Sequence, residues 1–351
     1  MQESKTGKIP NGQQAMAADL VKINTMNLLT ILCIFIISGF LLSYVLWEIY
    51  ADMEKTDEMA VYHNRYDMNV LGDSPWARTI KYGHELFDNT PEHLGPESDA
   101  PYAGNRLSCT NCHLQSGTKP YAAPLIGIVQ RFPQFGKREN KMGSLEDRIN
   151  GCMLRSMNGR PLPTDGEEME ALIAYMDWLG RYAPDHGEIK GKGFVRIQLP
   201  NRPVNLNAGK TVFEKHCIPC HGSDGAGKMA STGQGYLYPP LWGADSYNNG
   251  AGMTRVITAA NFIKANMPYG ATFDKPVLTD EEAYDVAGYI NRMPRPKKEG
   301  LNRDYPDLKK KPISSPYGPF VDHFPLEQHQ LGPFPPIVEY YKKQYRLIKN
   351  Q

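Results

Sequence analysis

The chain has 351 residues, enough for two or three domains, and 41% of them are hydrophobic, as in an ordinary globular protein. Its 39 lysines and arginines nearly balance 38 aspartates and glutamates, which leaves a formal net charge of +1. Because the basic excess typical of nucleic-acid-binding proteins is missing, no nucleic acid is expected as a partner.

The first predicted element is a membrane-spanning helix. Residues 23–47 contain no charged side chain, and residues 27–47 would span roughly 32 Å as a helix at about 1.5 Å per residue, one bilayer core. The stretch is longer than the apolar region of a cleaved signal peptide, and no small-residue cleavage site is visible. We therefore predict a signal anchor over residues 26–50, preceded by a cytoplasmic segment, residues 1–25.

The pattern C-x-x-C-H occurs twice, at residues 109–113 and 217–221. It is typical of covalent c-type haem attachment, in which both thiols add to porphyrin vinyl groups and the histidine binds iron. A zinc or redox C-x-x-C pair with an incidental histidine would explain one copy, but two copies favour two covalently attached c-type haems. The predicted attachment residues are Cys109, Cys112, His113, Cys217, Cys220 and His221.

Each haem motif lies inside a larger repeat. G-x-x-x-F precedes it, at residues 83–87 and 209–213, and places a glycine and a phenylalanine one turn apart for a close helix crossing. A helix with apolar residues at helical spacing closes each unit. Capping boxes predict where these helices start, and the paired residues are Thr164 with Glu167 and Thr279 with Glu282. Two unrelated helices with common caps would explain the closing helices alone, but a duplicated cytochrome c domain explains the whole pattern.

The second iron needs a sixth ligand besides His221, and the candidate is Met267. It lies 12 residues before Thr279, in the sequence N-M-P. Met253 and Met293 are alternatives, although Met253 comes early and Met293 falls at the far end of the closing helix.

In the first unit, counting the same 12 residues back from Thr164 reaches Cys152. Four of the six cysteines hold haem and Cys33 lies in the anchor, so Cys152 alone remains. We predict it as the ligand opposite His113, with Met153 or Met157 as alternatives. A thiolate lowers an iron potential and methionine raises it, so electrons would pass from the first haem to the second. A thiolate that leaves the iron would also be a nucleophile.

The sequence around Cys152 is basic and polar. Guanidinium groups bind oxyanions through paired hydrogen bonds, which suits an anionic substrate, but they also commonly bind haem propionates. Both roles remain open for each arginine. The residues concerned are Lys137, Arg138, Arg148, Arg155, Ser156, Asn158, Gly159 and Arg160.

These elements predict a mainly α fold with one N-terminal transmembrane helix, two tandem cytochrome c-like domains and an extended C-terminal arm. The first domain is assigned to residues 51–190 and the second to 191–296. Residues 181–208 are expected to be a linker, with a strand-like segment at 194–199. The arm, residues 297–351, is rich in proline, and composition alone would suggest disorder, whereas its aromatic residues argue for packing.

Several stretches resemble the dihaem thiosulfate dehydrogenases that form tetrathionate. They are residues 109–139 (CTNCHLQSGTKPYAAPLIGIVQRFPQFGKRE), residues 145–163 (LEDRINGCMLRSMNGRPLP), F-I-K-A-N-M-P and the tail from D-Y-P-D-L-K-K-K-P onward. The resemblance implies His/Cys ligation of the catalytic haem, which maps onto His113 and Cys152. Family active-site residues match Arg138 and Ser156, and we assign Arg160 as a further basic residue.

The resemblance implies that two thiosulfates are joined at their outer sulfurs. Some similar relatives run the reaction backwards and reduce tetrathionate. Some members have a lysine before the methionine of the second haem, but Asn266 stands there in this sequence, so ligation by His221 and Met267 is expected in both redox states. The apolar N-terminal helix is a second departure, since many relatives are soluble.

The preferred hypothesis is a membrane-anchored oxidoreductase acting on thiosulfate and tetrathionate. Because c-type haem is attached outside the bacterial cytoplasmic membrane, both haem domains are expected on the periplasmic side of a single-pass anchor. Electrons would then reach a cytochrome, a quinone-linked complex or an oxidase. The main alternative is a non-catalytic, membrane-anchored electron carrier, as a subunit of a respiratory complex for example. A sulfur-carrier cytochrome is third and a dihaem peroxidase last.

Overall fold

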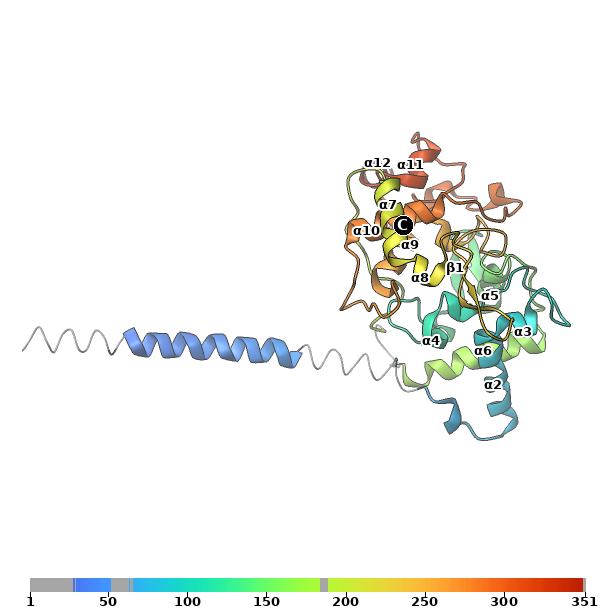
Figure 1. Ribbon diagram of the computed structural model, residues 1–351, viewed down its shortest axis with the longest axis horizontal. Coiled ribbons are helices and arrows are strands. Elements are labelled where there is room, and N and C mark those ends of the chain that lie inside the picture. Colours follow the sequence, from blue (N-terminus) through green and yellow to red (C-terminus); the bar gives the residue numbers. More distant parts are fainter. Residues whose placement is uncertain (1–27, 29, 52–62, 64–65, 184–188, 350–351) are drawn as a thin grey trace, which may run out of the picture. The chain divides into compact units, whose positions relative to one another are not determined.

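A computed structural model describes residue 28, residues 30–51, residue 63, residues 66–183 and residues 189–349 (Figure 1). The chain divides into two compact units, Met1–Glu58 and Met59–Gln351, and each is described by itself.

The described part of the first unit is an apolar helix, Thr30–Ala51. It has 22 residues, a mean hydropathy of 2.3 and exposed apolar side chains such as Phe40. By length and composition it is able to cross a membrane, and a signal sequence near the N-terminus has the same properties. The helix is therefore confirmed, and its role as an anchor stays a prediction. The cytoplasmic segment predicted for residues 1–25 lies outside the described residues.

The second unit begins with a helical domain built on a pair of packed helices, α2 and α6. Its buried core includes Ile80, Leu86, Phe87 and Tyr175. The elements are η1 (Met68–Val70), α2 (Pro75–Asp88), α3 (Thr90–Leu94), η2 (Cys109–Asn111), α4 (Leu114–Gly117), η3 (Val129–Arg131), β1 (Gln134–Gly136), β2 (Lys141–Gly143), α5 (Leu145–Met153), α6 (Glu167–Leu179) and η4 (Gly180–Tyr182).

A second helical domain follows, with its own core around α9 and α10. Phe213, Val286 and Ala287 are buried in that core, together with Ile337 and Tyr341 from the C-terminal arm. The elements are α7 (Leu206–His216), α8 (Ile218–His221), β3 (Lys228–Met229), β4 (Tyr236–Tyr238), η5 (Gly252–Thr254), α9 (Val256–Asn266) and α10 (Asp280–Asn291).

Both predicted close helix crossings are present. A Cβ atom added to Gly83 of α2 would lie 1.9 Å from the Ala171 carbonyl oxygen of α6. A Cβ atom added to Gly209 of α7 would lie 2.2 Å from the Asp285 carbonyl oxygen of α10. Only a residue without a side chain lets these backbones approach so closely, which explains the glycine of each G-x-x-x-F. The duplicated cytochrome c scaffold is confirmed.

One of the two predicted capping boxes is wrong. Thr279 and Glu282 bind each other's backbone amides at the start of α10, at 3.2 and 2.8 Å. In α6, however, the N-cap is Gly166, and Glu167 is the first helical residue. No side chain caps the start of α6, but three glutamates in its first turn interact favourably with the positive end of the helix dipole and stabilise it.

The strand prediction for residues 194–199 is also wrong. The amides of this segment bind side chains of the second domain instead of a strand: Ile197 donates to Asn261 and Gln198 to Asp280. Two antiparallel hairpins that the sequence did not reveal, β1–β2 and β3–β4, lie elsewhere.

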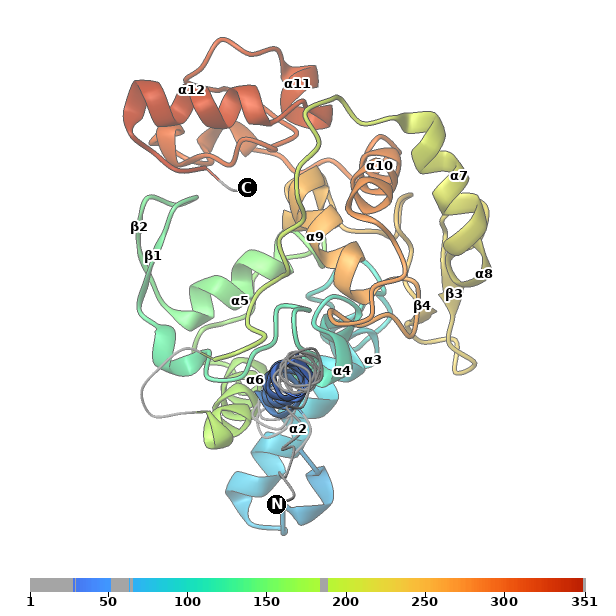
Figure 2. The same cartoon turned by 90° about the vertical axis from the view of Figure 1, so that its left-hand side faces the viewer.

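The C-terminal arm contacts both domains, as expected. The amide of Tyr305 donates to Arg138 in the first domain, and the Leu331 carbonyl accepts from Val204 beside the second. The arm is not extended throughout, however. It contains η6 (Leu301–Arg303), η7 (Leu308–Lys310), α11 (Leu326–Leu331) and α12 (Pro335–Tyr345). In Figure 2, α11 and α12 lie at one end of this unit and α2 at the other. The disorder suggested by composition is absent from the described part of the arm.

We expect Gly83→Ala to destabilise the protein, because the new methyl group meets a backbone carbonyl that cannot move aside. Overpacking of this kind costs about 1–3 kcal/mol, equivalent to roughly 5 °C in melting temperature. Thermal unfolding of the purified full-length protein measures the change. Gly72→Ala is the control, because nothing lies within 4 Å of a Cβ atom at that position. Equal melting temperatures for the two variants would contradict the crossing.

Candidate active site

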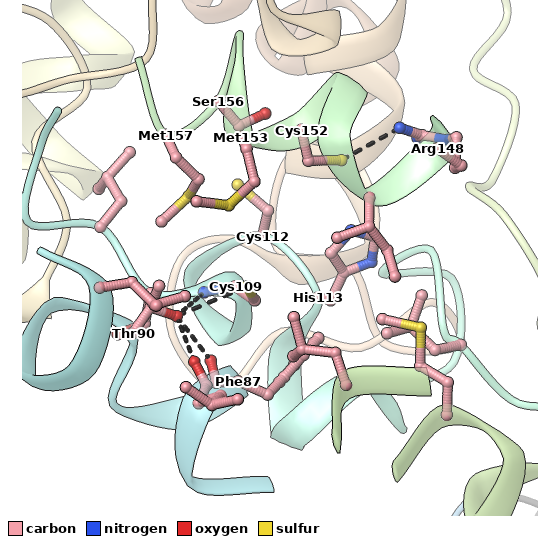
Figure 3. Close-up of a pocket in the computed structure, with 18 of the residues that line it drawn as sticks. Phe87, Thr90, Cys109, Cys112, His113, Arg148, Cys152, Met153, Ser156 and Met157 are labelled. Carbon is pink, nitrogen blue, oxygen red and sulfur yellow. Dashed lines mark hydrogen bonds between the residues drawn. The ribbon is translucent and has the colours of Figure 1, made fainter. Parts of the chain in front are cut away.

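A cavity in the first domain collects the predicted haem residues. It encloses about 850 Å³ of space free of protein atoms, part of it open to solvent. In Figure 3, Cys109, Cys112 and His113 approach from one side, and Cys152 and Ser156 from the α5 segment on the other. The apolar part of the wall consists of Leu86, Phe87, Leu94, Leu107, Leu125, Ile128, Leu145, Ile149, Met153, Met157, Leu172 and Met176.

Each C-x-x-C-H motif forms a single helical turn. The His113 amide donates to the Cys109 carbonyl at 3.0 Å, and the His221 amide donates to the Cys217 carbonyl at 2.9 Å. This turn brings the histidine to the cysteines, as attachment of one porphyrin requires. Within the described ranges, no group of three or more His, Cys, Asp or Glu side chains gathers as a zinc site would need. One turn that carries both thiols and the histidine fits c-type haem.

The ring of His113 is prepared to bind a metal. Its Nδ1 lies 2.7 Å from the Ala123 carbonyl oxygen, and since a carbonyl only accepts, Nδ1 carries the proton. Burial lowers the pKa of His113 to about 4, with a smaller contribution from the charge of Arg148. The imidazole is thus neutral near pH 7, and its Nε2 lone pair is available to iron.

His221 in the second domain is arranged in the same way. Its Nδ1 donates to the Pro239 carbonyl at 2.8 Å, and burial lowers its pKa. Cys217 and Met267 both pack against the hydrophobic core of this domain, as does the alternative ligand Met253.

Asn266, beside Met267, is 1% exposed. Its Nδ2 donates to the Phe262 carbonyl at 2.9 Å and to the Tyr121 carbonyl of the first domain at 3.1 Å. The amide group at this position is therefore held by two backbone carbonyls, one from each domain.

Cys152, unlike Met153 and Met157, has a charged hydrogen-bond partner. Arg148, one turn earlier on α5, donates from Nη1 to the Cys152 Sγ at 3.0 Å (Figure 3). Met153 and Met157 also line the cavity, but they are 2% and 3% exposed and belong to the hydrophobic core. The guanidinium thus places a cationic hydrogen-bond donor directly on the sulfur that points into the cavity.

The equal spacing that pointed to Cys152 does not hold. Because α6 is capped by Gly166, Cys152 lies 14 residues before the N-cap of its closing helix, whereas Met267 lies 12 before the N-cap Thr279. What the two residues share is their place in the fold. Cys152 is the next-to-last residue of α5 and Met267 is the C-cap of α9, so both stand where the preceding helix ends.

The three polar residues predicted beside Cys152 lie in different places. Ser156 lines the cavity, and Arg138 and Arg160 are not part of that lining. Arg138, in the turn between β1 and β2, lies 3.7 Å from Asp304 of the arm. Arg160 donates to the Pro101 carbonyl at 2.9 Å and lies over the Tyr102 ring, 4.3 Å from its centre.

Two buried asparagines that the sequence did not single out fix the segment after α5. Asn105 donates from Nδ2 to the Ser156 carbonyl at 2.9 Å. Asn248 of the second domain donates from Nδ2 to the Leu154 carbonyl at 3.0 Å. No local pattern marks either residue, because each acts on a segment distant in sequence. Arg148 belongs to the basic set around Cys152, and its spacing of one helical turn from Cys152 is the sequence signal that distinguishes it.

Comparison with known proteins agrees with this architecture. Residues 99–184 match the family model described as "SoxA/TsdA, cytochrome c domain", and residues 206–294 match the cytochrome c model. The thiosulfate dehydrogenase of Psychrobacter arcticus is 36% identical over 241 residues, 69% of this chain and 71% of that protein. That of Allochromatium vinosum is 40% identical over 231 residues, 65% of this chain and 82% of that protein.

A solved structure is similar as well. It is the thiosulfate dehydrogenase (TsdBA) from Marichromatium purpuratum in its "as isolated" form, 35% identical with a TM-score of 0.61. The match covers 67% of this chain and 50% of the Marichromatium chain. With two haem motifs on a duplicated cytochrome c scaffold and relatives at this level of identity, the chain belongs to the thiosulfate dehydrogenase family of dihaem c-type oxidoreductases.

Proposed function

We propose that this protein joins two thiosulfates oxidatively to form tetrathionate, at a first haem bound by His113 and Cys152. The enzymes that it resembles are thiosulfate dehydrogenases. The observation that carries the proposal is the 3.0 Å contact between Arg148 Nη1 and Cys152 Sγ at a cavity that also exposes His113. A structural spare thiol would not need a cationic donor.

The chemistry assigned to the chain is a sulfur transfer at Cys152. The thiolate and one thiosulfate form an S–S bond and release two electrons, which leaves a thiosulfonate group on the cysteine. The outer sulfur of a second thiosulfate then attacks that group, forms the central S–S bond of tetrathionate and releases the thiolate. The haems, when bound, supply iron centres that accept these electrons. Because every step is reversible, tetrathionate reduction at the same site is the reverse reaction.

Arg148 and Ser156 would bind the sulfonate oxygens. Both line the cavity beside Cys152, and both present N–H or O–H donors to an oxyanion. Arg138 and Arg160 would act from farther away, by adding positive charge that attracts a dianion towards the site.

In the second domain, His221 and Met267 would hold the haem that passes electrons onward. We propose that the helix Thr30–Ala51 anchors the protein to the bacterial cytoplasmic membrane, with the haem domains on the periplasmic side. A periplasmic or membrane-bound redox partner, such as a cytochrome, a quinone-linked complex or an oxidase, would then receive the electrons.

A second candidate function is electron transfer without a substrate. The observation that favours it is that Arg138 and Arg160 lie outside the lining of the cavity and are engaged with Asp304 and Tyr102. In this case the protein would be a tethered dihaem carrier, and Cys152 would only tune one haem.

Replacement of the proposed nucleophile separates the two candidates. We expect Cys152→Ala to lower thiosulfate-dependent haem reduction by roughly 100-fold or more, because both the ligand and the nucleophile are lost. Cys33→Ala removes the other cysteine outside the haem motifs and should leave the rate unchanged. Equal reduction by wild type and Cys152→Ala would contradict catalysis at Cys152, and no reduction of either protein would favour the carrier.

The two arginines assigned different roles should behave differently. Arg148→Gln removes the charged donor to Cys152 and should lower kcat/KM for thiosulfate by about tenfold or more, the value of a charge-assisted hydrogen bond. Arg160→Gln should change it by less than about threefold, because Arg160 contributes only distant charge. Steady-state kinetics with an artificial electron acceptor measure both variants. A larger effect of Arg160→Gln would reverse the assignment.

The ligand of the second haem is tested by potentiometry. We expect Met267→Ala to lower one of the two midpoint potentials by on the order of 100 mV, because loss of thioether ligation removes the factor that raises it. Met253→Ala should leave both potentials in place. If the Met253 variant shifts a potential and the Met267 variant does not, then Met253 is the ligand.

A further inference from the structure

We propose that Asp304, in the C-terminal arm, is a positioning residue of the catalytic site. Its carboxylate holds the segment that carries Cys152 and Ser156, and it orients the guanidinium of Arg138. The inference rests on the proposed function and extends it to Asp304, which lies outside the cavity lining and far along the chain from Cys152.

Asp304 binds side chains from two parts of the molecule at once. Its Oδ1 accepts from Arg155 Nη2 at 2.8 Å, and its Oδ2 accepts from Tyr317 Oη at 2.7 Å. The Nε of Arg138 lies 3.7 Å from the same Oδ2. The residue is 9% exposed, so water competes little for these contacts, and a buried ionised carboxylate depends on such partners.

Arg155 connects Asp304 to the site. Its amide donates to the Cys152 carbonyl at 3.1 Å, in the turn that ends α5. The Arg155 carbonyl accepts from the Asn248 amide at 3.1 Å, and the Arg155 Nη1 donates to the Gly250 carbonyl at 3.4 Å. The backbone that positions Cys152 is therefore fixed to the second domain by Arg155 itself and to the arm by Asp304.

The arm holds Arg138 by its main chain as well as by its side chain. The Tyr305 amide, next to Asp304, donates to the Arg138 carbonyl at 2.8 Å, and the Tyr305 ring centre lies 5.7 Å from the guanidinium carbon. The Arg138 side chain is 20% exposed. These contacts restrict the direction of the guanidinium, which fixes where its positive charge lies relative to the cavity.

Charge and positioning predict opposite effects on substrate binding. Arg138 and Arg155 both face Asp304, and Lys311 is close enough for the carboxylate to oppose the lowering of its pKa by burial. Removing the negative charge makes this region more positive and should not weaken binding of a dianion. A positioning role, in contrast, predicts slower turnover, because the sulfur and the oxyanion donors are no longer aligned.

The test compares Asp304→Asn with Glu299→Gln in the full-length haem-loaded protein. Both changes remove one negative charge from the arm, but Glu299 is exposed. We expect Asp304→Asn to lower kcat by about tenfold without raising KM for thiosulfate, and to alter the electron paramagnetic resonance signal of the first haem. Glu299→Gln should change none of these quantities, and thermal unfolding should show that both variants are folded.

An unchanged kcat and an unchanged first-haem spectrum in Asp304→Asn would overturn the inference. If that variant does not fold, Tyr317→Phe replaces it, because this change keeps the carboxylate and removes only its hydrogen bond. For Tyr317→Phe, a decrease of kcat smaller than tenfold supports the inference, and an unchanged kcat refutes it. If wild type itself shows no thiosulfate-dependent reduction, the proposed function fails, and the first-haem spectra still decide whether Asp304 positions the Cys152 segment.

Discussion

Arg148 places a cationic hydrogen-bond donor 3.0 Å from the sulfur of Cys152, at the edge of an apolar cavity. The contact is set by a helix, because residues four apart lie on the same face of α5. The segment that follows α5 is fixed by Asn105, Asn248 and the Arg155–Asp304 pair. A single cysteine thus receives its environment from the first domain, the second domain and the arm.

The two domains show how one scaffold presents two different candidate sets of ligand residues. In both, a glycine allows two helices to cross closely, and a C-x-x-C-H turn presents a neutral histidine whose Nδ1 is bound to a carbonyl. They differ at the end of the preceding helix, where one has a cysteine beside an arginine and the other a methionine beside a buried asparagine. The proposed difference between the two haems arises at this position, while the framework that carries the C-x-x-C-H turn is repeated.

Local sequence was a good guide wherever the physical cause was local. The haem motifs, the Gly83 and Gly209 crossings and the Thr279 cap each depend on residues a few positions apart. The Thr164 cap was mistaken because the backbone turns at Gly166 instead, and the strand at residues 194–199 because side chains of α9 and α10 take its amides. In the first case a local turn, with the Gly166 amide bound to the Pro163 carbonyl, starts the helix two residues later. In the second case contacts from elsewhere in the fold replaced the strand.

The sequence by itself determined two haem attachment sites and a helical repeat, because covalent attachment and helix contacts obey fixed spacings. It also selected Cys152, because this is the one cysteine left outside the haem motifs and the apolar helix. Only the tertiary structure decided that Ser156 lies in the cavity lining while Arg138 and Arg160 do not, and that Asp304 reaches the Cys152 segment. Asp304 and Arg155 are separated by a whole domain along the chain. The direction of their side chains follows from how the arm packs against both domains, which no spacing in the sequence records.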